Sequence, residues 1–308
     1  MNPEQIEFIA DQPGERLDKA ILARIGERLS RAQLQTLIAD GLVTLNGNPT
    51  KPGLKLKGGE QISLTIPVRD EPENVQPESI PLTIIYEDDD LAVIDKPAGM
   101  IVHPGEQNET GTLVSAALDR WPEITAMNIE EKRAGIVHRL DKDTSGLIVI
   151  AKNDLTRRRL SHQFQERSVE KTYLALVEKR PQTTTGRINA PIARDPQQRK
   201  RMAVVRGGRP AVTEFRVIED DFSAGQALLK VNIHTGRTHQ IRVHLAFIGC
   251  PVVGDRVYGY RTQRIGLKRQ FLHAAELALD HPTTGERLHF EAPLPVGLQN
   301  ILDKLRTR

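Results

Sequence analysis

The first 68 residues carry two helical repeats of apolar residues followed by a strand pattern. Apolar residues recur at helical spacing in two successive stretches, which are Leu17, Ile21, Ile25 and Leu29, then Leu34, Leu37 and Ile38. Ser30 is a suitable N-cap for the second helix, Gly41 is a suitable end, and Asn46-Gly47 predicts a hairpin turn. A half-buried strand is predicted by the alternation of Ile62, Leu64 and Ile66. The pattern predicts a small α+β domain over residues 1–68.

A segment without apolar periodicity separates this domain from the rest of the chain. Residues 69–81 belong to a stretch that holds four prolines between Pro67 and Pro81, which is typical of a linker or of an extended strap over the surface. After it come strand patterns at 82–85, 91–94, 146–151, 173–177, 215–218 and 228–233. Helical patterns lie between them, at about 112–120, 155–166 and 238–249. Residues 82–308 are therefore predicted to form a larger α+β domain with a mixed, largely antiparallel sheet.

Composition excludes several classes of protein. Hydrophobic residues make up 38% of the 308 residues, which is too many for a disordered chain. The single cysteine, Cys250, excludes an internal disulfide framework and a cysteine-based zinc site. Apolar runs fall far short of the roughly 18 residues that a membrane span needs, and the N-terminus lacks the pattern of a signal peptide. We therefore expect a soluble, cytoplasmic, globular protein.

The net charge of +3 hides a gradient along the chain. Residues 1–75 have a balance of −2, residues 76–152 a balance of −7, and residues 153–308 a balance of +12. This asymmetry predicts an acidic partner for the C-terminal half, most simply nucleic acid. The densest basic stretch is 194–209, with six basic residues and one acid, although a solvated loop with no partner is an alternative there. With only 4% aromatic residues, phosphate contact is favoured over base stacking.

The first candidate for chemistry is a polar loop between two apolar, strand-like pieces in residues 135–152. It contains Arg139, Asp141 and Asp143. A carboxylate on a loop between two core strands is rigidly held and yet accessible, which suits a nucleophile or a base. The two aspartates are also candidates for a paired general acid and base, but the sequence does not fix their separation. A simpler interpretation is that an aspartate caps a turn and pairs with Arg139.

The second candidate is a stretch rich in histidine and arginine in the C-terminal half, where Thr238 is predicted to cap a helix. Arg237 and Arg242 flank the predicted helix start, where oriented backbone N–H groups favour anions. His239 and His244 are five residues apart and so lie on different faces of a helix or a strand. This spacing argues against a chelated metal ion, and no metal site is predicted.

The third candidate is Tyr173, which shares a strand face with Ala175 and Val177. A lone tyrosine on a strand is more often a residue of the core or of a sheet edge than a catalytic one. The chain also lacks a Walker-type loop, a dinucleotide fingerprint and a nucleophile-elbow serine. Nothing in the sequence predicts a cofactor.

Together these segments resemble the large-subunit ribosomal RNA pseudouridine synthases, which act on uridines without a cofactor. Three blocks occur in the order typical of that family, namely His138-Arg-Leu-Asp-Lys-Asp-Thr-Ser-Gly146, the strand that bears Tyr173, and Thr235-Gly-Arg-Thr-His-Gln-Ile-Arg242. Further segments that look like family signatures are Pro104-Gly105, Val253 to Gly259, and Leu272-His-Ala274. Residues 14–68 resemble the S4 RNA-binding module that precedes the catalytic domain in these enzymes. The order of the segments is most similar to the member that modifies the stem-loop at the ribosomal subunit interface.

The resemblance implies a role for each residue of these blocks. Asp141 would be the catalytic aspartate, Tyr173 would stack against the target base, and Arg242 would pair with the aspartate. Arg139 would help to flip or replace the base, and Arg237 would contact the substrate. The implied reaction converts uridine to pseudouridine in large-subunit ribosomal RNA, either free or within an assembling subunit. A carboxylate near the sugar could attack C1′, attack C6 or take a proton from C2′, and in each case it must be ionised.

Further residues are expected to contact the RNA. Apolar walls would shelter the detached base from water, and the candidates for these walls are Leu140 and Leu272. Phosphate contacts are predicted in the basic stretch, at Arg199, Lys200 and Arg201. In the S4-like module, an RNA-binding face would depend on a local basic cluster of Arg16, Lys19, Arg24, Arg28 and Arg31.

Two other functions remain open at this point. A catalytically idle RNA-binding or ribosome-assembly factor is the main alternative, but binding alone has no need of Asp141 near phosphates. A nucleoside hydrolase or glycosidase that used Asp141 and Asp143 would release free uracil, whereas an isomerase would not.

Overall fold

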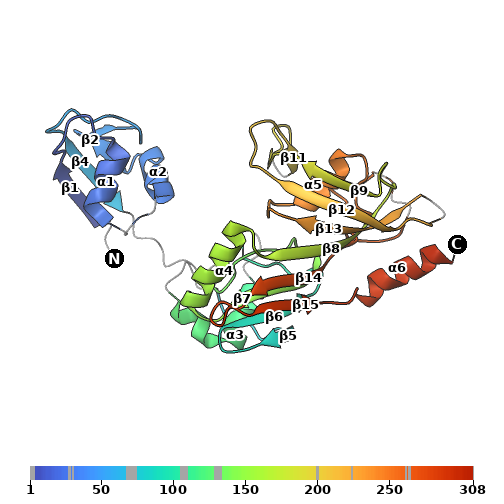
Figure 1. Ribbon diagram of the computed structural model, residues 1–308. Coiled ribbons are helices and arrows are strands. Elements are labelled where there is room, and N and C mark those ends of the chain that lie inside the picture. Colours follow the sequence, from blue (N-terminus) through green and yellow to red (C-terminus); the bar gives the residue numbers. More distant parts are fainter. Residues whose placement is uncertain are drawn as a thin grey trace. The chain divides into compact units, whose positions relative to one another are not determined.

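The chain folds into two compact units, Met1–Asn74 and Val75–Arg308 (Figure 1). The computed structural model describes residues 4–26, 29, 31–66, 75–104, 110–127, 134–198, 201–222, 225–260, 262 and 265–307. Both units combine helices with β-sheet, so the α+β class predicted from the sequence is confirmed. No helix in the described part of the chain is long and apolar enough to cross a membrane.

The first unit combines two helices with a four-stranded antiparallel sheet. Its elements are β1 (Glu4–Ile9), α1 (Leu17–Ile25), α2 (Arg31–Ala39), β2 (Val43–Leu45), β3 (Asn48–Pro49) and β4 (Gln61–Ile66). The strand order is β1-β4-β2-β3. Its core is built from the residues that set the helical and strand patterns, among them Leu17, Ile21, Leu34, Leu37, Ile62 and Leu64. The two predicted helices and the alternating strand are therefore confirmed.

Turn residues set the ends of these elements. Helix α1 is shorter than its apolar repeat suggests, because Gly26 takes a positive φ of 63° and ends it. Leu29 therefore lies beyond the helix, where it packs against the core. Asn46 and Gly47 have φ values of 50° and 75° and form the predicted hairpin turn between β2 and β3. Ser30, the predicted N-cap of α2, lies outside the described residues.

The second unit is built on a large mixed sheet with the strand order β5-β6-β7-β14-β8-β13-β12-β9, in which β15 also pairs with β14 (Figure 1). Every pair is antiparallel except the pair of β7 and β14. The strands are β5 (Thr83–Glu87), β6 (Leu91–Lys96), β7 (Ser145–Ala151), β8 (Glu170–Val177), β9 (Thr185–Asn189), β12 (Val212–Glu219), β13 (Ala227–Ile233), β14 (Leu272–Asp280) and β15 (Arg287–Glu291). A separate hairpin consists of β10 (Ile192–Arg194) and β11 (Met202–Val204). The helices are α3 (Leu113–Arg120), a 3₁₀ turn (Pro122–Ala126), α4 (Asp154–Glu166), α5 (Gln240–Phe247) and α6 (Val296–Arg306).

Helices cover both faces of the sheet at β6 and β7. On one face, Ile148 and Ile150 of β7 share a core with α3, and on the other face Leu147 and Val149 share a core with Leu160 of α4. This two-sided burial explains why β7 is an unbroken apolar run instead of an alternating one. The loop that precedes β7 is therefore attached to one of the most completely buried strands of the protein.

The segment before β5 lies against the second unit. Residues 75–82 form neither helix nor strand. The backbone N–H of Glu78 donates to the carbonyl oxygen of Ser115 at 3.0 Å, and its carboxylate accepts from the backbone N–H of Gly111 at 2.8 Å. The described part of the predicted 69–81 segment thus runs as a strap along this unit. Residues 69–74 lie outside the described part of the chain.

Two sequence-based expectations for this unit need correction. Strand β14 was not among the predicted strands, although it pairs with β7, β8 and β15. Its sequence, LHAAELALD, is buried on both faces and rich in alanine and leucine, so it lacks the alternation that marks a strand. Thr238 does not cap α5, because the helix begins at Gln240 after His239, which has a positive φ of 57°.

The pair of β7 and β14 depends on one glycine. Gly146 has a φ of 110°, and a Cβ there would lie 2.2 Å from the carbonyl oxygen of Ala274 in β14. The backbones of the two strands therefore approach more closely than any side chain allows.

We expect Gly146→Ala to lower the free energy of unfolding by about 3 kcal/mol or more, because backbone must move away from backbone. Gly249→Ala is the matched control. Its φ of 77° is also left-handed, but its added Cβ would meet nothing within 4 Å, so a loss of about 1 kcal/mol is expected. The only tryptophan, Trp121, is buried in this unit and reports its urea unfolding by fluorescence. Equal losses in the two variants would contradict the close approach.

Candidate active site

The three sequence blocks meet around one cavity of about 720 Å³ in the second unit. Its walls come from the loop before β7, the end of β13, the start of α5, one face of α4, strand β8 and the start of β14. The cavity brings together seven of the residues predicted from the sequence, namely Arg139, Leu140, Asp141, Tyr173, Arg237, Arg242 and Leu272. Residues separated by more than 130 positions in the chain thus line a single space.

The central contact of the cavity joins Arg242 to two carboxylates. Nη1 of Arg242 donates to Oδ2 of Asp141 at 2.9 Å. Its Nε and Nη2 donate to the two carboxylate oxygens of Asp255 at 2.7 Å and 3.0 Å. The guanidinium is buried and Asp255 fully so, whereas the Asp141 side chain remains 17% exposed. Arg242 is therefore held by Asp255 and presents its remaining edge to Asp141.

Burial and hydrogen bonds act in opposite directions on this group. Burial alone would raise the pKa of Asp255, but the hydrogen bonds from Arg242 and from the backbone N–H groups of Val257 and Tyr258 lower it below its ordinary value. Burial likewise opposes the charge on Arg242, and the hydrogen bonds and charges of Asp255 and Asp141 outweigh it and raise the pKa of the guanidinium. The ion pair of Arg242 and Asp255 is thus a fixed charge pair beside Asp141.

A buried lysine holds the loop that carries Asp141. Lys96, at the end of β6, is fully buried, and its ammonium donates to the carbonyl oxygens of Pro97, Met100 and Lys142 at 2.8, 2.9 and 3.1 Å. The Lys142 carbonyl is one residue from Asp141. The ammonium therefore joins the loop that follows β6 to the loop that carries Asp141. Lys96 was not singled out from the sequence, because its three partners are backbone groups that leave no residue-type signal.

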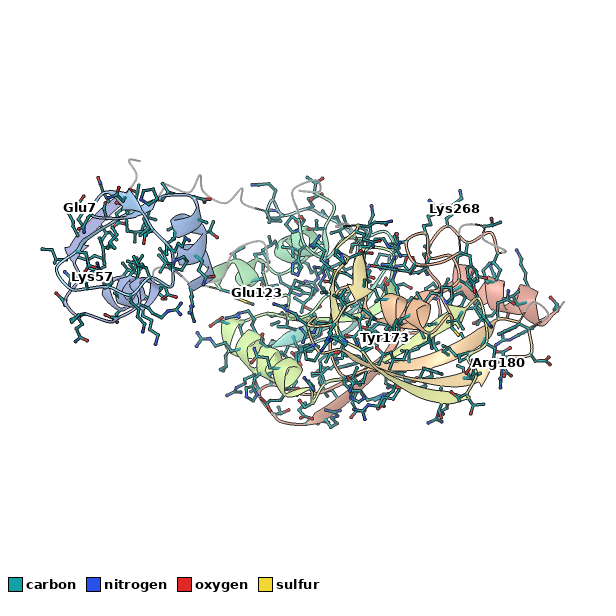
Figure 2. The ribbon with its side chains drawn as sticks, turned by 90° about the horizontal axis from the view of Figure 1, so that it is seen from above. Glu7, Lys57, Glu123, Tyr173, Arg180 and Lys268 are labelled. Atoms are coloured by element: carbon teal, nitrogen blue, oxygen red, sulfur yellow. The ribbon has the colours of Figure 1, made fainter. Side chains whose placement is uncertain are left out.

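The cavity also has an aromatic and apolar side. Tyr173 of β8 is 6% exposed and lies within the second unit among its strands (Figure 2). Burial raises the pKa of its phenol, and the nearby charge of Asp141 raises it further, so the phenol stays neutral. Leu140 and Leu272 are buried residues of the same walls. The arrangement offers a carboxylate, a fixed cation and a flat aromatic ring within a partly dry space.

Comparison with known proteins agrees with this arrangement. Residues 90–247 match the family described as RNA pseudouridylate synthase, and residues 15–62 match the S4 domain. The chain belongs to the RNA pseudouridylate synthase family. It is similar to an uncharacterised RNA pseudouridine synthase of Aquifex aeolicus, at 44% identity over 97% of this chain and 96% of that protein. It is also similar to ribosomal large subunit pseudouridine synthase D of Vibrio parahaemolyticus, at 42% identity over 96% of this chain and 92% of the relative.

A solved structure shares the fold over three quarters of the chain. The human RNA pseudouridylate synthase domain containing 1 superposes with a TM-score of 0.57 at 27% identity, covering 75% of this chain and 97% of that one. The protein is therefore an RNA pseudouridine synthase, an isomerase with an N-terminal S4 domain.

The remaining predicted residues of this pseudouridine synthase fall into two groups. In the cavity, the exposed Arg139 forms no ion pair with any described residue, so the simpler interpretation of an Arg139–aspartate pair finds no support. Nε of Arg237 donates to the carbonyl oxygen of Pro210 at 3.2 Å. Asp143, on the same loop as Asp141, belongs to the second group, because it is absent from the described cavity walls.

The second group lies outside the cavity walls. In the S4 domain, Arg16 and Arg31 both pair with the buried Asp18, at 2.9 and 3.1 Å, and these hydrogen bonds lower the pKa of Asp18 to about 2. The guanidinium of Arg201 lies 5.1 Å from the ring centroid of Tyr258. Three predicted residues, Arg28, Arg199 and Lys200, lie outside the described residues, as does Gly105 of the Pro104-Gly105 signature.

Among the described residues, one buried cation of the cavity, Lys171, has no carboxylate partner. Lys171 of β8 is 8% exposed, and its ammonium lies 5.2 Å from the ring centroid of Phe164 in α4 without an ion pair to any described residue. The ring of His138 also stacks on Phe164, with the ring centroids 4.7 Å apart, and it accepts a hydrogen bond from the backbone N–H of Val149. Burial lowers the pKa of Lys171 to about 8. It also lowers the pKa of His138 to about 3, with a further contribution from the Lys171 charge.

These values predict a pH dependence of stability. In the unfolded chain Lys171 titrates near pH 10.4, so between about pH 8 and pH 10.4 the unfolded state binds a proton that the folded state has lost. The free energy of unfolding should therefore rise over this range, by roughly 1–3 kcal/mol from this residue. In Lys171→Met that rise should be missing, whereas Lys230→Met, which removes a half-exposed lysine of β13, should retain it. Parallel pH profiles for the wild type and Lys171→Met would show that the ammonium is solvated.

Proposed function

We propose that this pseudouridine synthase isomerises specific uridines of large-subunit ribosomal RNA, at the stem-loop of the subunit interface, with Asp141 as the catalytic carboxylate. The observation that carries the proposal is the hydrogen bond from Arg242 to Asp141, in a cavity that Tyr173 also lines. Relatives named ribosomal large subunit pseudouridine synthase D, such as that of Vibrio parahaemolyticus, support the choice of RNA.

The reaction sets the requirements for Asp141. The N1–C1′ bond of uridine breaks, the base turns, C5 bonds to C1′, C5 loses its proton and N1 gains one. A carboxylate that attacks C1′ or C6, or that takes the C2′ proton, must be ionised. Hydrogen bonds from a guanidinium are stronger to a carboxylate than to a neutral acid, and Arg242 supplies one at 2.9 Å. Asp255 occupies the other edge of Arg242, so the guanidinium stays oriented toward Asp141.

The other walls suit a base that has left its stack. Extruding a base costs a few kcal/mol, which contacts in the pocket must offset. Tyr173 would stack on the base, and Leu140 and Leu272 would exclude water while the base is detached. The exposed guanidinium of Arg139 would fill the gap in the RNA or hold the flipped nucleotide, and Arg237 would contact the substrate backbone.

The division of the chain suits an RNA substrate. We assign RNA binding to residues 1–68, through a basic cluster that includes Arg16 and Arg31, and catalysis to residues 82–308, with 69–81 between them. The S4 match at residues 15–62 supports the first assignment. In this domain Asp18 offsets part of the positive charge of the two arginines.

The alternatives have weaker support. A binding factor without activity would gain nothing from burying Asp255 and Arg242 to orient one more carboxylate, since such burial costs free energy. A hydrolase that used Asp141 and Asp143 as an acid–base pair would need both in the cavity, and Asp143 is absent from its described walls. Neither alternative accounts for the match to the synthase family over residues 90–247.

We expect Asp141→Asn to abolish turnover, by roughly a thousandfold or more, with RNA affinity within about threefold of the wild type. The measurement is tritium release from large-subunit ribosomal RNA labelled at uridine C5, both free and in undermodified large subunits. Asp143→Asn is the matched control on the same loop and should retain activity. Retained release in Asp141→Asn would overturn the assignment, and release of free uracil would indicate a hydrolase.

We expect neutralisation of Arg199, Lys200 and Arg201 to weaken RNA binding and to flatten its dependence on salt. Each lost phosphate contact should reduce the slope of log Kd against log salt concentration by about 0.7–0.9. Filter binding at several salt concentrations measures the slope. The control neutralises Lys179, Lys230 and Lys268, which carry equal charge outside the basic stretch. An unchanged slope in the first variant would make the basic stretch a surface loop without an RNA contact.

A further inference from the structure

His239 occupies an unusual position next to Asp141. It precedes α5 and has a φ of 57°, a left-handed conformation that costs a residue other than glycine about 1 kcal/mol or more. Its side chain lines the cavity and is 24% exposed. Strained backbone at a cavity wall indicates that the position of this side chain matters.

A chain of hydrogen bonds fixes which ring nitrogen of His239 carries the proton. The backbone N–H of Met202 donates to the hydroxyl oxygen of Tyr258 at 2.9 Å, which leaves the hydroxyl proton free for another acceptor. That oxygen lies 2.8 Å from Nδ1 of His239, and because Nδ1 is the acceptor that the described hydrogen bonds offer this proton, we assign Tyr258 as the donor to Nδ1. In a neutral imidazole the ring proton must then sit on Nε2.

The surroundings keep this imidazole neutral. Burial lowers the pKa of His239, and the charges of Arg242 and Arg139 lower it further, against the opposing charges of Asp141 and Asp255. The Nε2–H is therefore a donor and not part of a cation. It lies 4.0 Å from Oδ1 of Asp141, which is too far for a direct hydrogen bond.

The gap between Nε2 of His239 and Oδ1 of Asp141 fits one bridging oxygen atom, and the two hydrogen bonds restrict which chemical group that oxygen can belong to. An oxygen about 2.8 Å from both Nε2 and Oδ1 would subtend an angle of about 90°, which a hydroxyl group can accept. That oxygen must accept a hydrogen bond from His239 and donate one to Asp141. A base carbonyl cannot donate, and the N3–H of uracil cannot accept. Inside an RNA chain the 3′ and 5′ oxygens are esterified, so the 2′-hydroxyl is the only group of the uridine that does both.

We propose that His239 and Asp141 together receive the ribose 2′-hydroxyl of the target uridine, with Tyr258 holding the tautomer of His239 that this requires. The proposal rests on the function proposed above, since it places the target nucleotide at Asp141. It gives the enzyme a means to select RNA at the reacting nucleotide itself. It also gives roles to His239 and to Tyr258, which stands in the Val253–Gly259 signature.

The same chain reaches the basic stretch. Met202 begins β11, and the neighbouring Arg201 lies over the ring of Tyr258. RNA phosphates bound along the stretch would therefore contact a segment that is one hydrogen bond from Tyr258 and two from His239. The hydrogen bonds from Met202 to Tyr258 and from Tyr258 to His239 would thus link phosphate binding outside the cavity to recognition of the 2′-hydroxyl inside it.

The test compares two substrates that differ by one oxygen. Large-subunit RNA is assembled by ligation so that the mapped target uridine, labelled with tritium at C5, carries either ribose or 2′-deoxyribose. The ratio of kcat/KM for the two substrates is measured by tritium release. The wild type should prefer ribose by about 10- to 100-fold, since the hydroxyl would bond a carboxylate and an imidazole.

His239→Asn removes Nε2–H with a residue that tolerates the left-handed backbone, and it should reduce the preference at least about fivefold. Tyr258→Phe keeps the ring but removes the hydroxyl that holds the tautomer of His239. It should therefore also reduce the preference for ribose. His162→Asn, on the exposed side of α4, should leave it unchanged.

Two outcomes would overturn the proposal. One is a wild type without preference for ribose, and the other is a preference in His239→Asn equal to that of the wild type. A purely structural role for His239 would lower both rates and leave their ratio constant. Failure of the underlying function would look different, because the wild type would then release no tritium from the ribose substrate, or Asp141→Asn would still release it.

Discussion

The candidate active site depends on the hydrogen bonds that one guanidinium, that of Arg242, donates to two carboxylates. Asp255 accepts hydrogen bonds from Nε and Nη2 of Arg242, and this two-point contact fixes the plane of the guanidinium. The remaining Nη1 donates to Asp141. Burying the charges of Arg242 and Asp255 costs free energy, which the two-point contact and the backbone bonds to Asp255 offset. A lysine at position 242 would provide the charge but not the plane. Asp141 therefore faces an oriented partner before any substrate arrives.

The sheet brings these residues together through its register. Residue His273 at the start of β14 pairs with Ser145 of β7, and Ala274 pairs with Tyr173 of β8. The loop before β7, the first residue of β14 and the ring on β8 must therefore adjoin one another. Gly146 permits the close approach of β7 and β14 that this register needs. The position of Asp141 thus depends on strand pairing, on the turn of its loop, and on the hydrogen bonds by which Lys96 and Arg269 hold that loop.

The sequence predicts the candidate site better than it predicts the sheet. Residues in the three sequence blocks, among them Asp141, Tyr173 and Arg242, could be selected by residue type and family resemblance, and the fold does bring them to one cavity. Strand β14 could not be predicted, because burial on both faces removes the alternation that identifies a strand. The sequence likewise does not predict the roles of Asp255 and Lys96, since each role follows from contacts between segments that are separate in the chain. Short local patterns, such as the hairpin at residues 46–47, were predicted because their cause lies in the turn itself.

The charges of the cavity divide into those that the fold neutralises and those that it leaves. Arg242 is matched by two carboxylates, and the ammonium of Lys96 is surrounded by three carbonyl oxygens. Within the described residues, Arg139 and Lys171 have no carboxylate partner, although both line the cavity. A buried charge without a partner is unfavourable until an anion enters, so under the proposed function a phosphate group of the RNA would gain most at the buried Lys171. Of Arg139 and Lys171, only Lys171 belongs to residues 153–308, so part of the +12 balance of that segment lies in the cavity wall itself.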